Sequence, residues 1–225
     1  MRTTVTTLLT LLISPLITPA ATLTYTAFDN NKPQHSVIFT ITKTHDTTKI
    51  NTHVTGDHLE ETNTCILSSK NNLISINQET RNDPDKAYFS WKISHQQNNY
   101  SDETYTEIKQ RTSKTSTVRI AAKSYPIQAL LYLFQEMPLS ENYTYTFTLL
   151  KPYQETYPIS CKVVEKTTLT LGTTSIPCYK IEATIDNFLS LFIPKSYFWL
   201  SVAKPHIPIQ YRDYRFEYRL QAPIS

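Results

Sequence analysis

Three cysteines, Cys65, Cys161 and Cys178, are the strongest nucleophiles in the sequence. A catalytic cysteine needs a base, a cationic cluster or a helix N-terminus that lowers the pKa of its thiol. The stretch LGTTSIPCYKIEAT around Cys178 contains no histidine and no cluster of cations. We therefore interpret Cys178 as a structural residue within a strand, and we predict no catalytic residue in this chain.

The pairing of the cysteines stays open at this level. Three cysteines permit one disulfide with one thiol left over, or three buried thiols. The segments LTLG and IPCYK predict a hairpin that turns near Gly172, in which Cys178 lies opposite Lys166 or Thr168. Cys161 does not face Cys178 in that hairpin, whereas a bond from the first cysteine to either of the others is compatible with it.

Histidines and carboxylates offer a second kind of chemistry, metal binding. His45, His53 and His58 lie near Asp46 and Asp57 in the sequence. The expected strand rises about 3.3 Å per residue, which separates the first two histidines too far for one ion. We therefore expect surface histidines and no metal site. No G-x-S-x-G or H-E-x-x-H motif occurs, and two glycines exclude glycine-rich phosphate and dinucleotide loops, so no cofactor is expected.

Residues 1–20 have the pattern of a secretory signal peptide. Arg2 supplies the positive start, residues 5–16 form an apolar run, and Thr18 and Ala20 are small residues suited to cleavage. An uncleaved N-terminal anchor is the alternative. We expect residues 21–225 to form a single β-rich domain that is exported to the periplasm or secreted, with membrane contact that is peripheral at most.

The remaining chain is typical of an all-β protein. Threonine and β-branched and aromatic residues are abundant, and turns rest on asparagine, aspartate and proline because glycine is scarce. Residues 36–44 and 47–56 predict a hairpin around the HDT turn. The net charge is only +3 and basic residues are scattered among acids, which argues against nucleic acid as a partner.

Aromatic residues alternate with polar residues in two late segments. Tyr143, Tyr145 and Phe147 share one face of the first segment, and Tyr214, Phe216 and Tyr218 share one face of the second. A period of two with rings on one side predicts a sheet with one buried face. Such rings form a solid core or line a ligand cavity. The candidate lining residues are Tyr143, Tyr145, Phe147, Trp199, Tyr214 and Phe216.

One segment departs from this strand pattern. Apolar residues of 125–136 recur at helical spacing, Ser124 is a candidate cap, Pro126 suits a first turn, and Pro138 stops the run. We predict one amphipathic helix that lies against the sheet or fills its open end. A second short helical or irregular turn is expected within 186–194.

The second half of the chain, about residues 120–215, resembles a bacterial family of exported proteins, the domain of unknown function numbered 3108. The residues that carry the resemblance are Pro138, Leu139, Glu165, Gly172, Thr173, Cys178, Tyr179, Lys180, Trp199, Ser201, Ile207 and Pro208. Where the family places glycine before the tyrosine strand, this chain has SENY, and Asn142 can adopt the same left-handed conformation. The resemblance implies a periplasmic, mainly β fold similar to an incomplete barrel, with Gly172, Cys178 and Pro208 as structural residues.

These observations predict an all-β fold, a mainly antiparallel meander that forms an incomplete barrel or curved sheet with one short helix. The function expected first is that of a non-catalytic envelope protein that binds a lipid or another apolar or amphipathic small molecule. An alternative is an interaction or assembly module whose open sheet edge accepts an envelope protein. A second alternative is an enzyme that acts on glycan or lipid.

Overall fold

The computed structural model describes residues 21–82, 87–95, 100–107, 112–119, 123–152, 156–186 and 194–221. Most of these residues form strands, as the threonine-rich and aromatic composition predicts. The strands of the first half are β1 (Ala21–Asp29), β2 (Lys32–Lys43), β3 (Thr47–Gly56), β4 (Leu59–Ser68), β5 (Leu73–Asn82), β6 (Ala87–His95), β7 (Tyr100–Glu107) and β8 (Thr112–Arg119).

The second half contains the helix and the remaining strands of the described chain. The helix is α1 (Ile127–Glu136), which follows a three-residue strand and precedes a seven-residue strand. The strands are β9 (Ser124–Pro126), β10 (Thr144–Leu150), β11 (Thr156–Leu171), β12 (Thr174–Ile185), β13 (Ser196–Ser201), β14 (Pro208–Arg212) and β15 (Glu217–Leu220).

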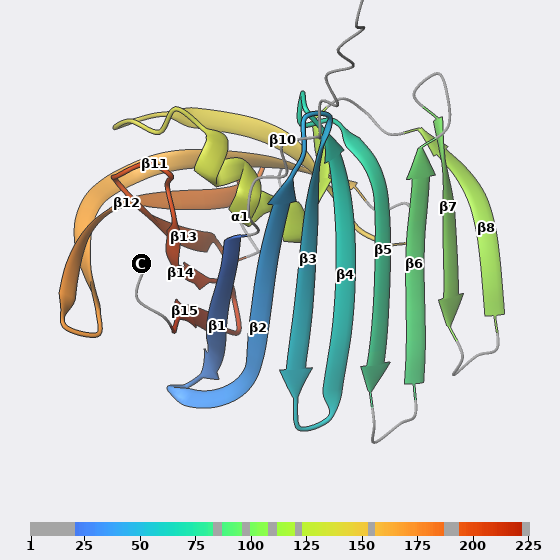
Figure 1. Ribbon diagram of the computed structural model, residues 1–225, viewed down its shortest axis with the longest axis horizontal. Helices are drawn as coiled ribbons and strands as arrows, with labels where there is room; N and C mark the ends of the chain where they lie inside the picture. The colour runs from blue at the N-terminus through green and yellow to red at the C-terminus, as the bar shows by residue number, and fades with distance from the viewer. Residues whose placement is uncertain are drawn as a thin grey trace, which may run out of the picture.

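All these strands belong to one curved sheet, so the predicted all-β class is confirmed. Strands β1 to β8 form an antiparallel meander, and β10 to β15 form a second one. Antiparallel pairing of β1 with β15, in which Tyr25 lies opposite Leu220, joins the two meanders. Strand β9 pairs in parallel with β10 and packs near β5 on the other side of the curve. The sheet therefore resembles a barrel that is not closed (Figure 1).

The turns use asparagine as the sequence predicts. Asn30, Asn31, Asn71 and Asn142 all have positive φ angles, between 49° and 63°. Asparagine tolerates this left-handed region better than most residues because its short side chain bonds locally. Gly172 has φ +60° at the tip of the β11–β12 hairpin. The hairpins predicted around HDT and near the glycine are both confirmed.

Helix α1 begins two residues later than the sequence predicts. Ser124 does not cap it, because Ser124 to Pro126 extend as β9 and pair with Thr148 to Leu150 of β10. Pro126 occupies the cap position with φ −72°, and no side-chain cap is present. The ladder with β10 therefore replaces the expected first turn. None of the described helices has the length and apolarity to cross a membrane. Of the second predicted turn, residues 187–193 lie outside the described chain.

Helix α1 fills the inside of the curved sheet, where Figure 1 shows it behind β1 to β3. It packs against β3, β4 and β9. The Phe134 ring is fully buried and meets Phe198 of β13 edge to face, with ring centroids 4.8 Å apart. At the rim, Lys43 forms an ion pair with Glu136 at 2.6 Å. The predicted position of the helix against the sheet is confirmed, and the helix touches two opposite walls.

Candidate functional site

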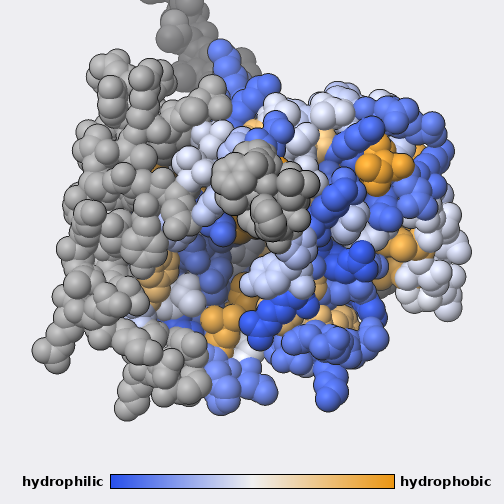
Figure 2. All heavy atoms as spheres, turned by 180° about the vertical axis from the view of Figure 1, so that it is seen from behind, coloured by the Kyte–Doolittle hydropathy of each residue, from blue (hydrophilic) through white to orange (hydrophobic). Residues whose placement is uncertain are grey.

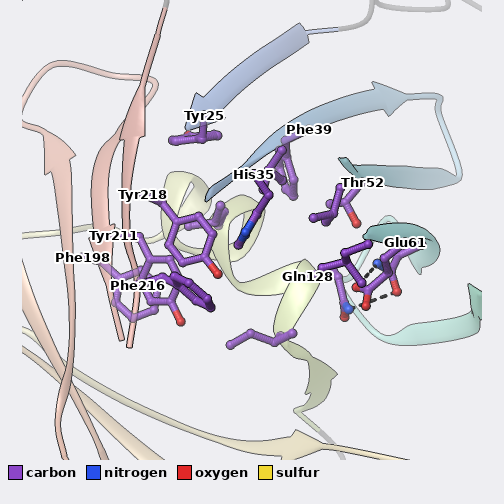
Figure 3. Close-up of a pocket in the computed structure, with 16 residues that line it drawn as sticks. Tyr25, His35, Phe39, Thr52, Glu61, Gln128, Phe198, Tyr211, Phe216 and Tyr218 are labelled. Atoms are coloured by element: carbon purple, nitrogen blue, oxygen red, sulfur yellow. Dashed lines mark hydrogen bonds between the residues drawn. The ribbon is translucent and has the colours of Figure 1, made fainter. Parts of the chain in front are cut away.

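A cavity of about 260 Å³ lies between α1 and the sheet. Its walls come from β1 to β4, from α1, and from the late strands β13 to β15 with the turn before β15. Strands from both ends of the sequence therefore meet at this cavity, because β1 pairs with β15. Figure 3 shows aromatic rings gathered on one side and polar groups opposite them. Seen from behind, the described surface is mainly hydrophilic with separate hydrophobic spots (Figure 2).

The aromatic side of the cavity is built by cross-strand stacking. Phe198 lies opposite Tyr211 in the ladder, and Tyr211 lies opposite Tyr218. The first pair of rings stacks with centroids 4.7 Å apart and the second pair with centroids 5.0 Å apart. Burial raises the pKa of the Tyr211 and Tyr218 phenols, so both stay neutral. The full aromatic lining is Tyr25, Phe39, Phe198, Tyr211, Phe216 and Tyr218.

The polar side is a short chain of hydrogen bonds that links β4 to the helix. Glu61 Oε1 accepts from Asn63 Nδ2 at 2.8 Å, and Asn63 Oδ1 accepts from Gln128 Nε2 at 3.0 Å. Glu61 Oε2 accepts from the Thr80 hydroxyl at 3.1 Å. Asn63 is only 4% exposed, so these hydrogen bonds hold polar groups at the cavity wall, away from bulk water.

Thr52 adds a buried hydroxyl to the same cavity. Its side chain is only 7% exposed, and its Oγ1 has no hydrogen-bond partner among the described residues. A buried hydroxyl without a partner costs roughly 1–3 kcal/mol. Because Thr52 lines the cavity, a ligand with a polar atom could bond to it and recover that energy.

A second cavity of about 350 Å³ adjoins the first. Both cavities are lined by Glu61, Ile127 and Gln128. The second cavity is completed by side chains of β5, β6 and the segment at the end of β10, which are Gln78, Trp91, Leu149, Leu150, Lys151 and Pro152. The hydrogen bonds of Glu61 therefore lie where an aromatic cavity meets a more polar one.

His35 stands between the aromatic and the polar sides (Figure 3). Its ring meets the Phe216 ring edge to face, with centroids 5.0 Å apart. Its partner in the ladder is Gly56, where a Cβ would lie 3.0 Å from the His35 Cβ, so glycine permits this close pairing. Burial lowers the pKa of His35. Asp213 and Glu61 act in the opposite direction, and Arg215 acts in the same direction.

The lowered pKa of His35 predicts a loss of stability in mild acid. The unfolded chain binds the proton more tightly, so the contribution of His35 is present above pH 6.5 and is lost as pH falls toward the folded pKa. We expect the urea midpoint of the protein to fall between pH 7 and pH 5.5, and to fall less in His35→Gln. His45→Gln is the control because its side chain is 91% exposed. Equal pH profiles for wild type and His35→Gln would contradict the assignment.

Of the residues predicted to line a cavity, Phe216 does so. Phe147 is buried and packs near Tyr125 of β9, with centroids 6.3 Å apart. Tyr143 and Tyr145 are half-buried and pack against the core. Tyr143, directly before β10, and the two β10 residues are not in the lining of the aromatic cavity, because β9 and α1 lie between β10 and the early strands.

Trp199 and Tyr214 also lie outside the aromatic cavity. Alternation along β13 turns Phe198 to the cavity and Trp199 to the other face, where Lys180 and Arg212 each approach to 5.8 Å from its ring centroid. Tyr214 is 76% exposed because the chain turns there and β15 begins only at Glu217. Trp199 and Tyr214, both candidate lining residues from the sequence, therefore do not line this cavity.

Of the three residues predicted to be structural, two are buried in the core and one shapes a turn. Gly172 forms the hairpin tip, with open space around it. The carbonyl of the fully buried Pro208 accepts a hydrogen bond from Tyr25 Oη at 2.8 Å. Cys178 is fully buried and lies opposite Thr167, one residue from the predicted partners on either side. The register runs without a shift from the pair Leu171–Thr174 beside the turn to this pair, and the bulge between Val163 and Glu165 lies beyond it.

Cys65, Cys161 and Cys178 are free and buried, which answers the question that their number left open. Burial raises the pKa of Cys65 and Cys161 to about 12 and that of Cys178 to about 11. We therefore expect no thiol to react with an aromatic disulfide reagent at pH 8 in the native protein, and all three to react in guanidinium. Fast labelling of the native protein would contradict the burial. One reactive thiol after unfolding would reveal a disulfide.

Glu61 and Asn63 were missed by the sequence reasoning. The burial of β4 alternates so that these two polar residues share the inward face with Cys65 and Leu67. Polar residues on the apolar face of an alternating strand are the signal that could have found them. His35 carried no such signal. Within the described part of the chain, no group of three or more His, Cys, Asp or Glu side chains could hold a metal ion.

An unclosed, curved sheet with a helix inside it defines a β-barrel-like domain. Its fold is similar to the crystal structure of a β-barrel-like protein of the domain of unknown function DUF1849 from Brucella abortus. The TM-score is 0.51 at 12% sequence identity, over 92% of this chain and 94% of that chain. No family model and no curated protein matches the chain. The similarity shows the fold alone, so the predicted barrel-like architecture is confirmed and family 3108 itself is not shown.

Proposed function

We propose that this chain is an exported, β-barrel-like binding protein that holds a small apolar or amphipathic molecule. The observation that carries the proposal is the cavity between α1 and the late strands. It combines an aromatic lining with the buried Thr52 hydroxyl, which has no hydrogen-bond partner in the described part of the chain. Binding sites for small molecules are typically apolar concavities with a few placed polar groups. Export rests on the pattern of residues 1–20, and membership of family 3108 rests on the residues of 120–215 that resemble it.

The size of the cavity limits the ligand. A cavity of about 150 Å³ accommodates benzene, so 260 Å³ corresponds to about ten non-hydrogen atoms. A straight eight-carbon chain with one polar atom has nine. Burial of eight carbons at ~0.8 kcal/mol each gives roughly 6 kcal/mol, a Kd on the order of tens of micromolar. Longer chains would have to extend out of this cavity.

The side chains that line the cavity support a binding role more than a catalytic role. Its lining includes one carboxylate, Glu61, and one imidazole, His35, whose pKa is lowered by burial. A glycosidase-type pair would need a second carboxylate across the cavity. The buried thiols have raised pKa values and are poor nucleophiles at neutral pH.

The alternative of an interaction module through the sheet edge has weaker support. Strand β8 stands at one end of the sheet order, and β9, at the other end, is only three residues long. The β8 sequence TSKTSTVR contains a lysine, which natural edge strands use to discourage pairing with another chain. We therefore place ligand binding first.

The proposal is tested by direct binding to the chain from residue 21 onward. We expect octan-1-ol to bind with a Kd on the order of 0.1 mM or tighter in isothermal titration calorimetry, with a negative heat-capacity change. We also expect native mass spectrometry of gently purified protein to retain a small apolar molecule. Absence of octan-1-ol binding to the folded protein, together with no retained molecule, would reject the proposal.

A further inference from the structure

The volume of the cavity limits the size of the ligand, and the position of Glu61 limits the chemistry of its polar end. Glu61 lines both cavities, and none of the other described residues that line the aromatic cavity carries a carboxylate. Apolar and aromatic side chains form most of the first cavity, which suits a hydrocarbon chain. The polar end of such a molecule would then lie at the junction, next to the Glu61 carboxylate and the Thr52 hydroxyl.

The hydrogen bonds that the Glu61 carboxylate accepts come from neutral groups and supply no positive charge. Asn63 Nδ2 donates to one carboxylate oxygen and the Thr80 hydroxyl donates to the other. Both donors are neutral, and each carboxylate oxygen retains acceptor capacity. Across the described part of the chain, no Lys, Arg or His side chain forms an ion pair with Glu61.

The basic side chains near Glu61 do not act as its countercharge. His35 has a lowered pKa and is neutral at pH 7. Arg215 is exposed and lies over the Phe216 ring at 4.7 Å from its centroid, outside the cavity lining. Lys151 lines the second cavity with an exposed side chain, and its Nζ lies 5.3 Å from the Tyr157 ring centroid. Among the described residues that line the aromatic cavity, the Glu61 carboxylate therefore has no Lys or Arg side chain as a countercharge.

We infer that Glu61 recognises the head group of the ligand, and that the site selects amphiphiles whose polar end is a protonated amine. An ammonium head group offers Glu61 three hydrogen-bond donors and a positive charge. A carboxylate head group offers only hydrogen-bond acceptors and a negative charge, which the Glu61 carboxylate repels. This inference rests on the proposed function, because it assigns the polar end of a molecule whose chain occupies the aromatic cavity.

The test compares three probes with the same eight-carbon chain, which are octylamine, octan-1-ol and octanoate. At pH 7.5 and low salt we expect octylamine to bind the wild-type protein at least tenfold tighter than octan-1-ol, and octanoate to bind weakest. We expect Glu61→Gln to weaken octylamine about tenfold, to change octan-1-ol less than threefold, and to strengthen octanoate. Glu60→Gln is the matched control, because Glu60 is the exposed neighbour on the opposite face of β4.

The outcomes separate this inference from the proposed function. Equal binding of octylamine and octan-1-ol to the wild-type protein would overturn the role of Glu61 and leave the cavity as a binding site. Binding of none of the three probes, together with no molecule retained in native mass spectrometry, would reject the proposed function itself. The wild-type series does not depend on the variant, so it remains decisive if Glu61→Gln does not fold. An equal loss in Glu60→Gln would show a general charge effect and would also overturn the inference.

Discussion

Replacing Phe134 with alanine is expected to lower the free energy of unfolding by about 3–5 kcal/mol. The ring is fully buried in α1 and packs edge to face on Phe198, so its removal loses apolar burial and leaves a hole between the helix and β13. In a domain of this size, that loss lowers the melting temperature by roughly 10 °C. Thermal and urea unfolding followed by circular dichroism measure both quantities.

Tyr214→Ala is the matched control for this prediction, since it also removes an aromatic ring. Tyr214 is 76% exposed and lies in the turn before β15, so we expect a change within about 0.5 kcal/mol. A Phe134→Ala protein as stable as Tyr214→Ala would show that α1 does not support the sheet from inside. Such a result would contradict the packing of the helix against two walls.

The second large effect is expected from filling the cavity with Val54→Trp. Val54 of β3 lines the cavity, and tryptophan adds seven non-hydrogen atoms there. At ~25 Å³ per atom, scaled from the benzene cavity, this addition takes up about two thirds of the space. We expect octan-1-ol binding to weaken at least tenfold. The fold should tolerate the change because the ring enters open space and displaces no packed side chain.

Thr55→Trp is the control for the filled cavity. Thr55 is the exposed neighbour of Val54 on the opposite face of β3, so the same indole placed there should leave binding unchanged. Calorimetry with octan-1-ol measures both variants, and circular dichroism confirms that both are folded. A folded Val54→Trp protein that binds like the wild type would place the ligand elsewhere and remove the main support for the proposed function.

Local patterns account for what could be predicted about the fold. The hairpins around HDT and Gly172 join neighbours in sequence, and their turn residues and alternation are visible without the fold. The same holds for α1, whose apolar spacing of 3.6 residues differs from the period of a strand. The start of α1 was misplaced because the pairing of Ser124 with Thr148 adds a strand that no local signal shows.

The candidate site could be predicted only in part. Phe216 was found because aromatic and charged residues alternate in the segment 214–220, and it lines the cavity from the turn before β15. The side of β13 on which Trp199 lies was predicted wrongly. Phe198, Trp199 and Leu200 are consecutive apolar residues and all are buried. Without alternating polarity, their sequence does not show which face of the strand is inside. Lys180 and Arg212 bury the tryptophan from the outer face.

The sequence by itself determined the all-β class, the position of one helix and the chemistry of the turns, because these depend on residues close together in the chain. Only the tertiary structure decided which rings share the cavity. It brings β1 beside β15, and so Tyr25 and His35 near residues almost two hundred positions later. It also decided that Glu61 stands in that cavity, where no described Lys, Arg or His side chain forms an ion pair with it. The closing of β1 on β15 depends on the summed twist and curvature of the whole sheet, which no short stretch of sequence specifies.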